Sequence, residues 1–182
     1  SLHDALPIFL NISVGACSKR GMSENSALVK GVNRAWDAGL VVVVAAGNNG
    51  PRTMSITTPG ISRKVITVGC SDDDREVLVG GNRMVDYSGR GPTAACICKP
   101  DLVAPGCSVV SCSSRADKYT IKSGTSMSTP IVSGAVALLL ERFPDMTNKD
   151  VKLRLRESSV DIGLPRNQQG WGKFNCKKFL AL

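Results

Sequence analysis

A continuous apolar stretch of the sequence, Leu40-Val41-Val42-Val43-Val44-Ala45-Ala46, is followed directly by Gly47-Asn48. The stretch is rich in β-branched residues and does not alternate between apolar and polar positions. Such a pattern is typical of a strand that is buried on both faces, as in a parallel sheet. We therefore expect a central parallel strand at residues 40–46, with its carboxyl end at the glycine.

The segments before this strand complete a β-α-β unit. Residues 9–14 form a short apolar segment closed by Gly15, and this pattern predicts a strand. Residues 23–38 carry apolar side chains at helical spacing, and Gly39 suits the left-handed position that ends a helix. The strand, helix and strand together span residues 9–46, and their alternation predicts an α/β fold class.

The rest of the chain continues with helices and shorter strands. Residues 48–64 are rich in Gly, Pro, Ser and Thr and predict a loop, whereas residues 65–70 predict another buried strand. Residues 126–143 predict a helix buried nearly all round, and a capping box of Thr147 and Asp150 predicts a further helix to about residue 157. Between the strand at residues 65–70 and the helix at residues 126–143 we expect the short strands of an irregular antiparallel annex to the sheet, at residues 85–87, 102–104, 108–111 and 119–122.

The composition indicates one ordinary soluble domain. The 182 residues are 42% hydrophobic, and the apolar runs fall short of the ~20 residues that a membrane-spanning helix needs. The net charge of +8 comes from scattered Lys and Arg without interleaved aromatic residues, so we expect no nucleic-acid partner. No signal peptide is visible, but the sequence begins with Ser1 rather than Met, so the cellular location stays open.

The cysteines indicate neither a zinc ribbon nor a complete disulfide framework. They are seven in number, which is odd, and they form no Cys-x-x-Cys pair. Several lie in apolar segments, where cysteine behaves as a small buried hydrophobe. We therefore expect free thiols, no metal site and no cofactor. The cysteines are Cys17, Cys70, Cys96, Cys98, Cys107, Cys112 and Cys176.

Two polar residues lie where the expected elements present dipoles and free backbone groups. Ser126 begins the most apolar helix, so the positive end of the macrodipole and the free N–H groups of the first turn lie beside its hydroxyl. Asn48 follows the strand at residues 40–46, at the end where ligands bind in open parallel sheets. Each residue also has an ordinary structural interpretation, because serine is a favoured N-cap and asparagine is common in turns.

Three motifs in chain order resemble one enzyme family. Gly-Thr-Ser-Met-Ser-Thr-Pro at residues 124–130 resembles the sequence around the nucleophile of subtilisin-like serine peptidases. Ala-Ala-Gly-Asn at residues 45–48 is similar to the oxyanion motif of that family, and Asn-Ile-Ser-Val-Gly at residues 11–15 is similar to its substrate-cleft strand. The resemblance implies a three-layer subtilisin-like fold, with a mainly parallel sheet flanked by helices and truncated at the N-terminus.

The resemblance also implies the site of a serine endopeptidase. Ser126 would be the nucleophile, and the side-chain amide of Asn48 would stabilise the oxyanion together with the backbone N–H of Ser126. The substrate would be a polypeptide bound as an extended strand. A cis-proline turn is implied at Pro59, and the family can bind calcium, although no calcium site is identifiable in this sequence. The residues implied to bind substrate are Ser13, Val14, Gly15, Ala45, Ala46, Gly47 and Thr125.

The catalytic histidine and aspartate of such a peptidase have no match in this sequence. Its one histidine, His3, precedes Asp4 and lacks the His-Gly-Thr motif of the family, so we interpret it as a terminal residue exposed to solvent. Residues 1–8 do not resemble what should precede the cleft strand, and we expect them to be non-native or disordered. Residues 9–182 are then a partial peptidase domain, inactive and poorly soluble alone, with one sheet edge unpaired.

Two other functions fit parts of the sequence. A catalytically dead relative that binds peptides or acts as a structural module would share the fold, and only an upstream Asp-x-Gly and His-Gly-Thr pair would distinguish it from an enzyme. A nucleotide-binding domain is disfavoured, because Gly47 and Gly50 fit neither Gly-x-Gly-x-x-Gly nor a P-loop. The sequence predicts neither the peptide specificity nor the oligomeric state.

Overall fold

A parallel sheet forms the centre of the protein. The computed structural model describes residues 8–16, 24–114 and 118–181. Its main sheet has the order β1-β2-β3-β6, in which every neighbouring pair is parallel. The strands are β1 (Phe9–Ile12), β2 (Val41–Ala45), β3 (Ile66–Cys70) and β6 (Leu102–Ala104). This arrangement confirms the α/β class.

The expected β-α-β unit is present, with tighter bounds than the sequence pattern indicated. Helix α1 (Ala27–Asp37) begins after Ser26, whose hydroxyl accepts a hydrogen bond from the backbone N–H of Val29 at 3.3 Å. It ends before Gly39, which has a φ of 95°. Strand β1 pairs with β2 from Phe9↔Val41 to Ile12↔Val44 and stops there, so the expected strand at residues 9–14 is shorter. Beyond this pair of residues β1 and β2 are no longer paired.

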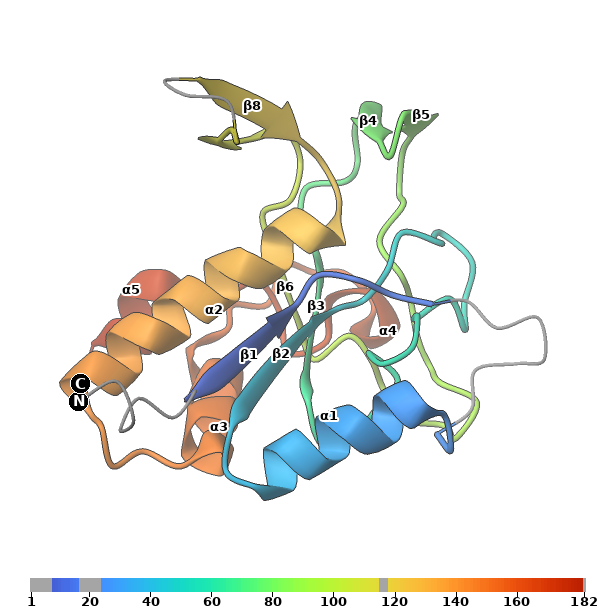
Figure 1. Cartoon of the computed structure of the whole chain (residues 1–182). Helices are drawn as coiled ribbons and strands as arrows, with labels where there is room; N and C mark the ends of the chain where they lie inside the picture. The colour runs from blue at the N-terminus through green and yellow to red at the C-terminus, as the bar shows by residue number, and fades with distance from the viewer. Residues whose placement is uncertain (1–7, 17–23, 115–117, 182) are drawn as a thin grey trace.

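Helices cover both faces of the sheet, which makes the fold three-layered. Every residue of β2 is buried, as expected for a strand with side chains packed on both faces. Helix α2 (Thr125–Arg142) lies against one face and contacts all four strands, and α1 covers the other face (Figure 1). Apolar side chains of α2, including Val132, Val136 and Leu139, are fully buried in the resulting core.

The smaller strands differ from the expectation in two ways. Residues 102–104 are β6 of the main sheet rather than part of an antiparallel annex, because their apolar side chains pack in the core beside β3. The expected strand at residues 85–87 does not form. Instead β4 (Val77–Val79) and β5 (Asn82–Met84) form a hairpin whose turn, Gly80-Gly81, has positive φ at both positions. A second hairpin, β7 (Val109–Cys112) with β8 (Tyr119–Lys122), agrees with the expectation, and both project beyond the sheet (Figure 1).

Three shorter helices complete the described part of the chain. Helix α3 (Asn148–Ser158) begins with the expected capping box of Thr147 and Asp150. Helices α4 (Arg166–Gln169) and α5 (Cys176–Leu180) follow, and α5 contacts both α2 and α3. Among the described helices, none is long and apolar enough to cross a membrane.

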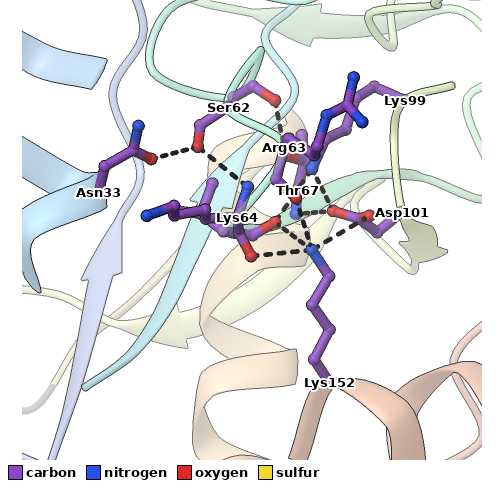
Figure 2. A network of polar contacts seen from close by, with 10 residues as sticks. Asn33, Ser62, Arg63, Lys64, Thr67, Lys99, Asp101 and Lys152 are labelled. Carbon is purple, nitrogen blue, oxygen red and sulfur yellow. Dashed lines mark hydrogen bonds and ion pairs between the residues drawn. The ribbon is translucent and has the colours of Figure 1, made fainter. Parts of the chain in front are cut away.

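A buried polar network holds the loop between β2 and β3 against α3. The ammonium group of Lys152 donates to the backbone carbonyls of Arg63, Lys64 and Val65, at 2.8–3.0 Å. Figure 2 shows Lys152 reaching the segment of Arg63 and Lys64. The ammonium group of Lys99 donates to the same Val65 carbonyl at 3.0 Å and to Asp101 Oδ2 at 2.5 Å. Burial lowers the pKa of Lys152 to about 8. The network anchors one end of the loop that carries Pro59, which follows a cis peptide bond.

Candidate active site

Ser126 is the second residue of α2, and its position depends on the glycine before the helix. Gly124 is the N-cap with a φ of 139°, a conformation that L side chains rarely adopt. Thr125 and Ser126 therefore lie in the first turn of the helix, where backbone N–H groups have no helical carbonyl four residues earlier to bind. The hydroxyl of Ser126 donates to the backbone carbonyl of Ser13 at 2.7 Å. The N-terminus of α2 and the carboxyl end of β1 thus lie in contact.

Asn48 lies beside the same helix end and is held by Thr125. Its Oδ1 accepts hydrogen bonds from the backbone N–H and from the hydroxyl of Thr125, each at 3.0 Å. A backbone N–H can only donate, so this contact sets the amide orientation and leaves the NH₂ group turned away from Thr125. The hydroxyl of Thr125 also accepts from Gly47 N at 3.1 Å. Thr125, which is buried and directly precedes Ser126, therefore binds the segment at the carboxyl end of β2.

The structure brings Asn48 and Ser126 to one end of the sheet, as the motif order indicated. The Asn48 NH₂ group lies 3.2 Å from the position that a Cβ on Gly124 would occupy, so the amide lies at the start of α2. The first turn of α2 contains no acidic residue to offset the positive end of the helix dipole. This end of the helix is suited to stabilising an oxygen that acquires negative charge.

None of the side chains in this arrangement can act as a strong base. Ser126, Asn48, Thr125 and Ser13 carry hydroxyl and amide groups, and the carbonyl that accepts from Ser126 is neutral. His3 is the one histidine of the sequence, and it lies outside the described residues. The described residues therefore supply a nucleophile and hydrogen-bond donors, but no imidazole beside them.

The two expected walls of a substrate pocket lie on either side of Thr57. Ser13 is half-buried and Val14 and Gly15 are exposed, whereas Ala45 and Ala46 are buried and Gly47 is half-buried. A Cβ at Gly15 or at Gly47 would lie 2.1–2.5 Å from side-chain atoms of Thr57. Both glycines are therefore needed for the close approach of this one side chain.

Thr57 was not singled out by the sequence motifs, yet it contacts both walls. Its backbone N–H and its hydroxyl both donate to Ala46 O, at 2.8 and 3.3 Å, and the side chain is 3% exposed. The next residue, Thr58, exchanges backbone hydrogen bonds with Ala16, so the chain after β1 pairs directly with the segment that carries Thr57. The glycine in each wall motif was the available signal, since glycine in such a segment often marks close approach of another group.

One group of described side chains could hold a metal ion, although the sequence indicated none. The thiols of Cys70 and Cys107 and the carboxylate of Asp72 have donor atoms within 4.8 Å of one another. The two cysteines are far apart in the sequence, so ligand spacing along the chain did not reveal the group. Burial raises the pKa of both thiols. None of the three residues has a hydrogen bond to the Asn48 or Ser126 side chain among the described contacts, and Cys70 ends β3.

Comparison with known proteins identifies the family. The model of the subtilase family, peptidase S8, matches residues 6–172. Serine protease AprX of Bacillus subtilis is 40% identical over 164 residues, which cover 82% of this chain and 37% of that protein. Subtilisin DY of Bacillus licheniformis is 34% identical over 156 residues, which cover 85% of this chain and 50% of that protein. The chain thus spans between about a third and half of these relatives.

Solved structures agree with this family. Sphericase matches with a TM-score of 0.73 and 29% identity, over 92% of this chain and 56% of that one. The prenylagaramide maturation protease PagA matches with a TM-score of 0.73 over 95% of this chain and 61% of that one, and its 22% identity limits the likeness to the fold. The subtilisin-like fold and the family match, taken together, show that this chain belongs to the subtilase family.

Proposed function

We propose that the protein containing this chain is a serine endopeptidase that hydrolyses polypeptides through an acyl-enzyme on Ser126. The observation that carries the proposal is the bridge of Thr125, which places the Asn48 amide beside the start of the helix that bears Ser126. In this mechanism Ser126 Oγ attacks the scissile carbonyl carbon, and the carbonyl oxygen becomes an oxyanion. The Asn48 NH₂ group and the Ser126 N–H donate hydrogen bonds to that oxyanion.

The proton of Ser126 has to leave during the attack, and among the described residues no base is in hydrogen-bond contact with its hydroxyl. The carbonyl of Ser13, to which the hydroxyl donates, is a hydrogen-bond acceptor and not a base. Because His3 lacks the His-Gly-Thr motif, we propose that a histidine and an orienting aspartate outside this sequence accept the proton, and expect no hydrolysis from the 182-residue chain alone. Two observations support this view. The chain matches only 37–50% of the two curated relatives compared, and β1 has no partner on its outer side within the described residues.

The backbone of residues 13–15 is the proposed substrate edge. These residues leave the pairing with β2 after Ile12, and Val14 is 68% exposed. An extended peptide could add beside them by backbone hydrogen bonds, with one side chain entering the gap between the two walls. Thr57 would limit the depth of that gap, because its side chain already lies between Gly15 and Gly47.

The test is active-site labelling of the intact protein with a phosphonate that reacts with activated serine. We expect labelling at Ser126 and peptide hydrolysis in the wild type, and loss of both in Ser126→Ala. A matched control is Ser111→Ala, which removes the hydroxyl of an exposed serine on β7 and should change neither. Hydrolysis that persists in Ser126→Ala at the wild-type rate would contradict the proposal.

The same experiment separates the enzyme from a catalytically dead relative. The described residues lack a base beside Ser126, and that observation favours the alternative of a peptide-binding or structural module. Such a module would bind an extended peptide, but it would neither react with the phosphonate nor release product. A labelled Ser126 in the intact protein therefore excludes it.

A further inference from the structure

Four polar side chains contact one another near the N-terminus of α2, and the proposed reaction uses none of them. Cys70 ends β3, Asp72 follows two residues later, Cys107 lies between β6 and β7, and Tyr87 follows β5. The Tyr87 hydroxyl lies 3.1 Å from Cys70 Sγ and 3.2 Å from Cys107 Sγ. Cys70 Sγ lies 3.1 Å from Asp72 Oδ1. We name this group the Cys70 cluster.

The carboxylate of the cluster is held in place by the backbone. Asp72 Oδ1 accepts hydrogen bonds from Gly106 N at 2.8 Å and from Cys107 N at 3.2 Å. The Tyr87 hydroxyl is also close to Gly106 O, at 3.2 Å, so both oxygens are connected to the same peptide segment. Supporting hydrogen bonds of this kind orient the ligands of a metal site.

The donor set and its spacing fit a soft divalent cation. A tetrahedral Zn²⁺ with bonds of about 2.3 Å to sulfur and about 2.0 Å to oxygen separates its ligand atoms by roughly 3.5–3.8 Å. The ligand atoms of Cys70, Asp72 and Cys107 lie within 4.8 Å of one another, so small side-chain rotations would reach this geometry. Two sulfurs and one carboxylate are ligands that Zn²⁺ accepts, whereas Ca²⁺ and Mg²⁺ require oxygen.

We propose that Cys70, Asp72 and Cys107 form a binding site for Zn²⁺ or a cation of similar softness, with the Tyr87 oxygen or a water as fourth ligand. Binding converts two thiols to thiolates and releases two protons, and the cation forms two bonds to sulfur and one to carboxylate oxygen. Two protons leave and one divalent cation enters, so the net charge of the cluster does not change when the fourth ligand is neutral. No additional net charge is therefore placed beside Cys70 and Tyr87, which are buried, whereas Asp72 and Cys107 are half-buried.

The site would connect to the candidate active site through one peptide segment. Gly106 O, the carbonyl beside Tyr87, accepts a hydrogen bond from Gly124 N at 2.9 Å. Gly124 is the N-cap of α2, two residues before Ser126. A cation bound to the Cys70 cluster would therefore also hold Gly106 and Cys107 in place, and Gly106 is hydrogen-bonded to the N-cap of α2. Because the cation would bind only the folded protein, it would raise the thermal unfolding temperature.

The experiment is a titration of the intact, fully reduced protein with Co²⁺ without oxygen, followed by Zn²⁺. We expect one equivalent of Co²⁺ to produce thiolate-to-cobalt charge-transfer absorption, and one equivalent of Zn²⁺ to remove it. Cys107→Ala should weaken binding by more than about 100-fold, beyond the 10–100-fold effect typical of outer-shell partners. Cys112→Ala, at an exposed cysteine on β7, is the matched control and should bind as the wild type does.

A second variant keeps the test decisive if a cysteine variant fails to fold. Asp72→Asn retains an oxygen that can accept from Gly106 N but removes the anionic ligand, so it should fold and lose affinity at least about 10-fold. Circular dichroism of each variant reports on folding independently of the metal. The proposal is wrong if the reduced wild type gives no charge-transfer absorption at stoichiometric Co²⁺. It is equally wrong if the absorption is unchanged in folded Asp72→Asn and Cys107→Ala.

Discussion

Replacing Thr125 with valine removes one hydroxyl while keeping the shape of a fully buried side chain. That hydroxyl donates to Asn48 Oδ1 at 3.0 Å and accepts from Gly47 N at 3.1 Å. The variant leaves Asn48 with one of its two donors, the Thr125 backbone N–H at 3.0 Å, and leaves Gly47 N without its acceptor. An unsatisfied buried N–H costs about 1–3 kcal/mol, and because Gly47 is half-buried the free energy of unfolding should fall by about 1 kcal/mol, the lower end of that range.

The expected effect of Thr125→Val on catalysis follows from the loss of one of the two hydrogen bonds that hold the Asn48 amide. Removing an oxyanion donor altogether lowers kcat about 10²–10³-fold in subtilisin, a value measured on that relative. Asn48→Ala should approach this loss if Asn48 has the proposed role. Thr125→Val keeps the donor but loosens its orientation, so we expect kcat to fall about 10-fold, or about 1.4 kcal/mol, with KM nearly unchanged.

The assay is steady-state hydrolysis of a chromogenic peptide by the intact protein, with chemical denaturation of the same samples. Thr125→Ser is the matched control, because it keeps the hydroxyl and loses only a methyl group, and it should recover most of kcat. A purely structural role would lower stability in Thr125→Val without changing kcat of the folded fraction. That result, or an equal loss of kcat in Thr125→Ser, would refute a positioning role for Thr125.

Three further outcomes follow from the described contacts. Thr57→Gly should empty the gap between the pocket walls and shift kcat/KM in a peptide panel toward larger side chains; an unchanged ranking would show that Thr57 does not limit the pocket. Asp101→Asn should lower the free energy of unfolding, measured in urea, by about 3–5 kcal/mol, because it leaves the buried ammonium of Lys99 without its carboxylate. The control Asp37→Asn breaks an exposed ion pair with Lys64 and should lower it by less than about 1 kcal/mol. Burial lowers the pKa of Lys152 from 10.5 to about 8, so between these two pH values the unfolded chain binds more protons than the folded one, and the free energy of unfolding should rise from pH 8 to 10. Lys152→Met should abolish that rise. An equal rise in the wild type and the variant would contradict the assignment to Lys152.

The sequence alone determined the features whose signals are local. The unbroken valine run predicted a strand buried on both faces, and β2 is buried at every position. Capping residues and helical spacing located α1 and α3, and the Gly-Thr-Ser motif located the start of α2. These elements were predictable because strand burial, helix caps and motif spacing depend on residues close together in the chain.

The tertiary structure decided the features that depend on long-range contacts. Asn48 and Thr125 are separated by 77 positions, and only their hydrogen bonds show which end of the amide is free to donate. Thr57 enters the site because two glycines in different segments leave space for it, and Leu102 joins the main sheet because β3 lies beside it. Such contacts form when parallel strands and their connections bring distant residues to one edge of the sheet. Packing in three dimensions, rather than order along the chain, sets their geometry.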